Sequence, residues 1–289
     1  MHTTCLRYCL VQHAPVESID EFDTELATLV TENPGVDLFV FPEMHLCGGE
    51  ADGPLDALKR FIEPLDGPRD QRLRNAAKRH GIWLIPGSVY EHDPMSPSTG
   101  GIRAFNTASA YSPAGERVAS YRKIFPWQPH EHATPGSDFT VFQLGEFGRV
   151  GISICYDIWF PEHARQLAWL GADLIINVVR TGTNDREQEL VLCRAAAIAN
   201  QLGVLSVNAA SPGARGRSIA VDAEGRLRVE AMDSSEQELI DTIDLADSRR
   251  VRRTGTSGCN RVWDQLDFSP VSLPMYRDGV IQPSPMARN

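Results

Sequence analysis

Short apolar runs alternate with segments of helical periodicity along most of the chain. The apolar runs predict strands at residues 6–11, 36–43, 82–90, 104–111, 118–121, 149–155, 170–179, 204–207 and 238–243. A turn at Ala223-Glu224-Gly225 predicts a hairpin over residues 218–229. The helical periodicity predicts helices at 18–31, 70–80 and 185–200, and one that begins near Pro161.

Strands that are apolar on both faces and separated by helices indicate sheets covered by helices. Their number, about ten or more, exceeds what a single twisted sheet holds comfortably. We therefore predict an α/β fold in which two stacked sheets carry helices on their outer faces. Neither a linker nor a repeat divides the sequence, so residues 1–289 are expected to form a single domain.

The segment 249–289 differs from the rest of the chain. It is rich in Pro, Arg and Ser and shows little periodicity. An irregular terminal segment of this length becomes ordered only when it docks on a surface. We therefore expect this tail to pack across a partner subunit.

The composition argues against several partners. The chain carries 28 Lys and Arg against 38 Asp and Glu, and its formal net charge of −10 repels nucleic-acid phosphates. No apolar run approaches the ~20 residues that span a bilayer, and the first residues do not resemble a signal peptide. The six cysteines form no C-x-x-C motif, as a zinc ribbon or a thioredoxin site would need. We expect a cytoplasmic protein with reduced thiols and with no nucleic-acid or membrane partner.

Three residues with reactive side chains follow predicted strands. Glu43 ends the strand at 36–43, Lys123 follows the strand at 118–121, and Cys155 ends the strand at 149–155. Ligand sites of α/β sheets collect at the carboxyl ends of strands, so we expect these side chains to meet in one cleft. A cysteine thiolate attacks carbonyl carbons, a glutamate can move its proton, and a lysine can stabilise an oxyanion. Taken singly, each residue is also compatible with a structural role, as a solvated charge or a buried thiol.

The local sequence around these residues favours a site. FPEMHLCG at 41–48, YRKIFPWQPHE at 121–131 and ICYDIWFPE at 154–162 occur in an order that resembles the nitrilase superfamily of carbon–nitrogen hydrolases. The resemblance runs from about residue 6 to residue 245. It implies a four-layer α-β-β-α sandwich of two mixed sheets, a homodimer or higher homo-oligomer, and no metal or organic cofactor. It also implies a catalytic triad of Glu43, Lys123 and Cys155.

Glu131 is a fourth candidate, because the segment that contains it is similar to one in aliphatic amidases of the family, where a Glu orients the substrate. His130 and His132 flank Glu131 and suggest a metal site as an alternative. H-E-H, however, lacks the H-E-x-x-H spacing that places two imidazoles on one helix face. Residues 151–155, GISIC, begin like the G-x-S-x-G motif around a nucleophilic serine, but the final glycine is missing, so Ser153 is the weaker nucleophile candidate.

The residues after Cys155 bear on the substrate. Cys155-Tyr156-Asp157 resembles amidases and carbamoyl hydrolases of the superfamily, whereas nitrilases usually read C-W-E. We therefore predict hydrolysis of a small linear amide through a Cys155 thioester, with release of ammonia and a carboxylic acid. An N-carbamoyl amino acid or amine is the alternative substrate. A catalytically inactive small-molecule-binding protein and a redox sensor at Cys155 remain as alternatives of another class.

Three further residues are candidates for substrate binding. Arg180 follows the strand at 170–179, so it could bind a substrate carboxylate at the same edge as Cys155, or it could pair with Asp185 or Glu187. Trp127 and Tyr156, together with Phe125, could shape a small apolar pocket. These aromatic residues could equally serve as packing.

Overall fold

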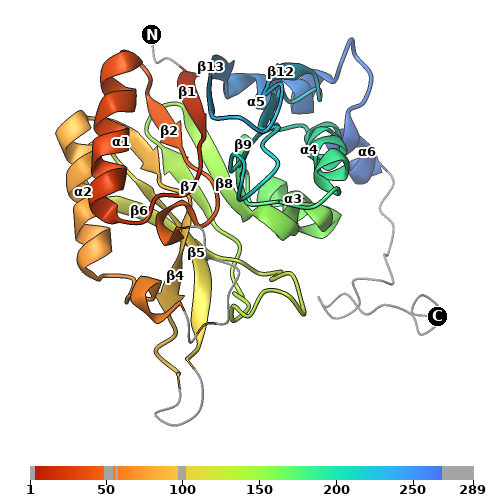
Figure 1. The fold of residues 1–289 in the computed structure, drawn as a ribbon. Helices are drawn as coiled ribbons and strands as arrows, with labels where there is room; N and C mark the ends of the chain where they lie inside the picture. The colour runs from red at the N-terminus through yellow and green to blue at the C-terminus, as the bar shows by residue number, and fades with distance from the viewer. Residues whose placement is uncertain (1–3, 49–54, 56–57, 97–101, 269–289) are drawn as a thin grey trace.

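The computed structural model describes residues 4–48, 55, 58–96 and 102–268 (Figure 1). Two β-sheets stack on each other. The first contains, in order across the sheet, β13 (Gln237–Asp244), β1 (Cys5–Gln12), β2 (Leu38–Val40), β3 (Trp83–Ile85), β5 (Ala104–Tyr111) and β4 (Ser88–His92), with β6 (Arg117–Arg122) paired to β5. The second contains β12 (Leu227–Glu230), β11 (Ile219–Val221), β10 (Gly203–Asn208), β9 (Leu174–Val179), β8 (Gly148–Ile154) and β7 (Val141–Leu144). Both sheets are mixed.

Each sheet has a parallel centre. Strands β1, β2 and β3 run parallel in the first sheet, and β8, β9 and β10 run parallel in the second. The remaining strands pair antiparallel at either side of these centres. Because the carboxyl ends of parallel strands meet at one edge, each centre offers an edge at which loops converge.

Helices cover the outer face of each sheet. Figure 1 shows α1 (Ile19–Glu32) and α2 (Pro68–His80) on one side of the molecule, and α3 (Pro161–Trp169) and α4 (Arg186–Asn200) on the other. Helix α1 begins where the Ser18 side chain accepts the backbone N–H of Glu21, and it buries Phe22, Leu26 and Leu29. Prolines open α2 and α3 at positions where their missing N–H has no cost.

Among the described residues, three of the four clusters of buried apolar side chains match this arrangement. One cluster lies between the sheets and combines residues of both, such as Leu10 and Ile152. A second joins α1 and α2 to the first sheet, and a third joins α3 and α4 to the second sheet. The fold is thus the predicted α/β sandwich of two mixed sheets flanked by helices, and that prediction is confirmed.

Several element boundaries differ from the predictions. The single strand expected at 82–90 is two strands, β3 and β4, because Pro86 and Gly87 interrupt it. Strand β7 was not predicted; it is a short edge strand with two buried residues, Phe142 and Leu144. The expected buried strand at 170–179 begins only at Leu174, after a turn.

The tail also contains regular structure that was not predicted. Helix α5 spans Ala246–Thr254 and α6 spans Val262–Phe268, so the prediction of an irregular segment is wrong for residues 249–254 and 262–268. Helix α5 buries only Ser248 and Val251, and this leaves little apolar periodicity to detect. The described part of the tail contacts its own chain, since Arg249 Nη1 lies 2.9 Å from Asp173 Oδ2 and Trp263 packs against Trp169. Residues 269–289 lie outside the described residues, and docking on a partner stays a prediction.

Within the described ranges, no helix is both long enough and apolar enough to cross a membrane.

Candidate active site

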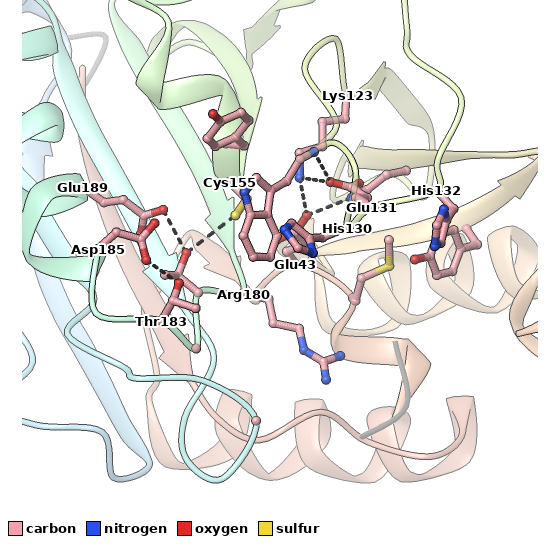
Figure 2. A pocket seen from close by; sticks show the side chains of 18 residues that line it. Glu43, Lys123, His130, Glu131, His132, Cys155, Arg180, Thr183, Asp185 and Glu189 are labelled. Atoms are coloured by element: carbon pink, nitrogen blue, oxygen red, sulfur yellow. Dashed lines mark hydrogen bonds and ion pairs between the residues drawn. The ribbon is translucent and has the colours of Figure 1, made fainter. Parts of the chain in front are cut away.

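The candidate residues from the sequence converge on one cavity of about 390 Å³ (Figure 2). Lys123 directly follows β6, Cys155 directly follows β8, and Glu43 lies a short step beyond β2. The cavity wall includes all seven residues predicted for catalysis or substrate binding, namely Glu43, Lys123, Trp127, Glu131, Cys155, Tyr156 and Arg180. The structure therefore brings together, from both sheets, residues that the sequence places far apart.

The loop after β2 places Glu43 between the two sheets. The backbone N–H of Glu43 donates to the carbonyl of Val179, at the end of β9 in the second sheet, over 3.3 Å. On the other side the loop packs closely on Gly87, where a Cβ would lie 1.8 Å from the Pro42 carbonyl oxygen. A glycine at this position, with its φ of +83°, allows the approach.

Lys123 lies between two carboxylates. Its Nζ donates to Glu43 Oε1 over 3.0 Å and to Glu131 Oε2 over 2.6 Å. All three side chains are largely withdrawn from solvent. The backbone N–H of Trp127 also donates to Glu131 Oε2, so the turn after Lys123 holds Glu131 in place.

Asn106 joins the same group, although the sequence analysis did not identify it. Its Nδ2 donates to Glu43 Oε1 over 2.8 Å and to Glu131 Oε1 over 2.9 Å. The backbone carbonyl of Asn106 accepts the backbone N–H of Lys123. Asn106 lies within β5, where no local motif surrounds it, and only the pairing of β5 with β6 brings it beside Lys123.

The burial of these groups sets their protonation. Burial raises the pKa of Glu43 above its ordinary value, and the attraction of Lys123 offsets this only in part. Burial works against the charge on Lys123, but Glu43, Cys155 and Glu131 raise its pKa well above the usual range. Burial also acts on Glu131, yet the bond from Lys123 lowers the pKa of that carboxyl. The cluster thus holds a charged lysine, a charged Glu131 and a Glu43 carboxyl that takes up a proton more readily than usual.

Cys155 occupies a sharp turn at the end of β8. Its φ is +46°, in the left-handed region, and such a conformation in a residue other than glycine is a mark of functional sites. The helix predicted to begin near Pro161 is α3, and a 3-10 helix, Cys155–Trp159, lies between β8 and this helix. Burial raises the pKa of the Cys155 thiol well above its ordinary value, and Glu43 adds to this effect.

Asp157 links the turn that carries Cys155 to the turn that carries Lys123. Its Oδ2 accepts the backbone N–H of Ile154 over 2.9 Å, and its Oδ1 accepts the backbone N–H of Phe125 over 3.0 Å. The hydroxyl of Tyr121 also donates to Oδ2 and lies 2.8 Å from His163 Nε2. Asp157 is fully buried, so these hydrogen bonds, rather than bonds to bulk water, satisfy its acceptor atoms.

The other cavity wall comes from the second sheet and α4. Thr181 Oγ1 lies 3.7 Å from Cys155 Sγ and donates to Glu189 Oε1 over 2.8 Å. Arg186, also buried, donates to Glu189 Oε2 over 2.9 Å. The sequence analysis missed Thr181 and Glu189. The available signal was the position of Thr181 directly after Arg180, at the end of a predicted strand.

The predicted substrate-binding residues Arg180, Trp127 and Tyr156 also line the cavity. Arg180 Nη1 donates to the carbonyl of Gly48 over 3.2 Å. The Trp127 ring lies 4.3 Å from the His130 ring and is 42% exposed. Phe125, in contrast, stacks on Phe160 and is not part of the cavity wall, so its packing alternative fits better.

The structure does not support the two alternative sites of the sequence analysis, a nucleophile at Ser153 and a metal site around His130 and His132. Ser153 is fully buried inside β8 and does not line the cavity. Among the described residues, no group of three or more His, Cys, Asp or Glu side chains could hold a metal ion.

The four-layer arrangement is that of the nitrilase superfamily. Nit3 from Saccharomyces cerevisiae, a member of branch 10 of that superfamily, aligns with a TM-score of 0.74 and 25% identity over 86% of this chain and 93% of that chain. Within the superfamily, this chain belongs to the carbon–nitrogen hydrolase family, whose family model matches residues 10–253.

Two further relatives are informative. A formamidase of Bacillus cereus (strain G9842) is 30% identical over 203 residues, which cover 68% of this chain and 59% of the formamidase. The chain thus spans less than two thirds of that relative. An amidase from Nesterenkonia sp. AN1 aligns with a TM-score of 0.67 and 23% identity, covers 89% of this chain and 96% of that chain, and supports the fold.

Proposed function

We propose that the protein is an amidase that hydrolyses a small linear amide to a carboxylic acid and ammonia, with Cys155 as the nucleophile. The observation that carries the proposal is one cavity lined by a cysteine in a strained turn, a buried charged lysine and a buried carboxyl of raised pKa. Formamidases among the relatives of this chain support an amide as the substrate.

The reaction follows from the groups at the cavity. As the Cys155 sulfur attacks the amide carbonyl carbon, its proton passes to Glu43, which accepts it readily because of its raised pKa. Lys123 and the backbone N–H of Tyr156 stabilise the negative oxygen of the tetrahedral intermediate. Glu43 then gives the proton to the nitrogen as the carbon–nitrogen bond breaks, and ammonia leaves an acyl thioester on Cys155.

Water completes the cycle. Glu43 takes a proton from the water that attacks the thioester, the carbon–sulfur bond breaks, and the proton returns to the sulfur. Glu131 does not react in this scheme. It keeps Lys123 charged and oriented through the bond between Glu131 Oε2 and Lys123 Nζ.

The test compares amides, N-carbamoyl amino acids and nitriles in an assay for released ammonia. We expect short amides to be hydrolysed, Cys155→Ala to lower the rate by at least about a thousandfold, and Cys259→Ala, which removes an exposed thiol, to leave it unchanged. Fluoroacetamide is a suitable probe, because its acetamide moiety adds covalently to the active-site cysteine in a Glu-to-Gln mutant of the Nesterenkonia amidase. Intact mass should show this adduct in the wild type and in Cys259→Ala, and none in Cys155→Ala.

Three outcomes would contradict the proposal. Ammonia from carbamoyl compounds but not from amides would support the alternative substrate. Full activity in Cys155→Ala would exclude the nucleophile. An absence of both ammonia and adduct would support a binding role for the cavity.

A further inference from the structure

A chain of polar contacts leads from Cys155 to a buried ion pair that the proposed reaction does not use. It runs from Cys155 Sγ to Thr181 Oγ1, from there to Glu189 Oε1, and from Glu189 Oε2 to Arg186 Nη1. Figure 2 shows Glu189 to one side of Cys155 and Lys123 to the other. The thiol is therefore flanked by two separate charged groups, one around Lys123 and one around Glu189.

The protons in this chain can be counted. Arg186 is 1% exposed and donates to Glu189 as well as to the carbonyls of Gly216 and Arg217. A guanidinium and an indole N–H only donate, so Glu189 accepts at both of its oxygens, from Arg186 at Oε2 and from Trp159 Nε1 at Oε1 over 3.4 Å. The Thr181 hydroxyl has a single hydrogen, and it gives that hydrogen to Glu189.

This count decides whether Cys155 Sγ or Thr181 Oγ1 donates the hydrogen in the contact between them. With its hydrogen engaged by Glu189, Thr181 Oγ1 presents lone pairs to Cys155, and the thiol is the group that must donate. We propose that Thr181, oriented by Glu189 and Arg186, is a positioning residue that holds the Cys155 thiol protonated in the resting protein. The inference rests on the proposed function in so far as it concerns the nucleophile of that reaction.

The groups around the thiol agree with this assignment. Burial raises the pKa of Cys155, Glu43 at the end of β2 and Glu189 on α4 add to it, and Lys123 and the backbone N–H of Arg180 oppose it. Glu131 enters this charge balance through Lys123, and it is held there by a hydrogen bond from Lys123 Nζ to Glu131 Oε2. Since the thiolate is the reactive form towards oxidants and alkylating agents, a held thiol is protected until Glu43 removes its proton.

The test measures how fast iodoacetamide alkylates Cys155 in the folded, full-length protein from neutral to alkaline pH, read by mass on the peptide that contains Cys155. Removing an acceptor of the thiol hydrogen destabilises the neutral form. Thr181→Val should therefore move the profile to lower pH by about half a pH unit or more, which is roughly threefold faster alkylation at a fixed pH. Thr181→Ser keeps the hydroxyl and should keep the wild-type profile.

Controls separate protonation from access and folding. The limiting rate at high pH reports access to the sulfur, and thermal unfolding reports the fold. Thr181→Ala, which also lacks the hydroxyl, should give the same shift as Thr181→Val. A shift to higher pH in the folded variants would show that Thr181 donates to the thiolate, and an unchanged profile would show that it does not act on the thiol; either overturns the inference.

The readout does not depend on amide hydrolysis. A shifted profile in a protein that hydrolyses no amide would contradict the proposed function and leave the inference standing. An unshifted profile in a protein that hydrolyses amides would overturn the inference and leave the proposed function standing.

Discussion

Lys123 keeps its charge in a place where burial opposes it, because it donates to two carboxylates. The two carboxylates differ in the direction of their pKa shifts, upward for Glu43 and downward for Glu131. Pairs of titratable groups driven apart by their surroundings commonly divide acid–base work between them. In the proposed reaction this division gives proton transfer to Glu43 and the support of Lys123 to Glu131.

The raised pKa of Glu43 predicts a pH profile. A general base must be deprotonated, so kcat/KM for a neutral amide should fall as the pH drops through the Glu43 pKa. Because that pKa is raised by burial, the fall should lie above the ordinary glutamate pKa of 4.5. A profile that stays flat down to that value would contradict the assignment of Glu43 as the base.

Replacement of Glu131 tests its supporting role. In Glu131→Gln, Lys123 loses one of its two carboxylate partners, and its ammonium group becomes less firmly placed. We expect kcat to fall by about a hundredfold, with a smaller change in KM, because the loss concerns the transition state. Glu32→Gln, on the exposed end of α1, serves as the control and should retain wild-type kinetics. Equal loss in both variants would point to a general effect on the protein.

The residues that sequence reasoning could and could not find differ in their surroundings. Glu43, Lys123 and Cys155 each stand at the end of an apolar strand within a distinctive segment, so they could be predicted. Asn106 lies in the middle of β5, and Thr181 and Glu189 are separated from Cys155 by a strand and a helical turn. Their places depend on strand register and on side-chain direction, which local patterns do not encode.

At the scale of helices and strands, some elements could likewise be predicted from the sequence and others could not. Strands and helices with clear apolar periodicity, such as β8 and α1, could be predicted. Helix α5 could not be predicted, because it carries few buried residues, and Pro86 and Gly87 divide an apolar run that reads as one continuous strand.

The elements at the site are connected by polar contacts. Asp157 holds the turn after β8 and the turn after β6 with one side chain.

Asp157→Asn tests this connection. The asparagine places an amide N–H₂ where one of the carboxylate oxygens accepts backbone hydrogens, so at least one buried N–H loses its partner. We expect the free energy of unfolding to fall by about 2 to 3 kcal/mol and amidase activity to fall with it. Urea titration provides the measurement. Asp138→Asn, on an exposed loop, is the matched control, and a similar small effect in both variants would show that Asp157 is dispensable.

A second polar cluster joins the Glu43 loop to its neighbours. Glu25 on α1 accepts from His13 Nδ1 over 2.7 Å and from His45 Nε2 over 2.8 Å, and His45 belongs to the short 3-10 helix after Glu43. Burial opposes the charge on Glu25, but the two histidines lower its pKa from 4.5 to about 2. Bonds to Glu25 and Glu238 raise the pKa of His13 against the effect of burial.

These shifts predict the pH dependence of stability. The contribution of Glu25 is present above pH 4.5 and is lost as the pH falls towards 2. The contribution of His13 is present below its ordinary value of 6.5 and is lost as the pH rises through its raised pKa. Glu25→Gln should therefore lower the free energy of unfolding most between these limits, by about 3 kcal/mol. Urea titrations of both proteins at acid, intermediate and alkaline pH check this, and a constant difference would contradict it.

At the scale of the whole molecule, the outer helical layer of the second sheet leaves apolar side chains in solvent. Val191 and Ile198 on α4 are 66% and 51% exposed, and their spacing of two turns places them on one helix face. Ile198 also lies beside Gly225, next to β12, where Leu227 is 50% exposed. Exposed apolar side chains that lie close together are a feature of surfaces that associate. They favour the homodimer that the sequence analysis predicts.

Val191→Asp tests this association. In a symmetric dimer the substitution enters the interface twice, and each buried carboxylate lacks a partner, so we expect the dimer to dissociate at micromolar concentration. Light scattering after size exclusion should give twice the chain mass for the wild type and the single-chain mass for the variant. Met95→Asp, at a site 78% exposed in the first half of the chain, should leave the wild-type mass unchanged. A monomeric wild type would contradict the dimer, and a Val191→Asp variant that stays dimeric would place the contact on another face.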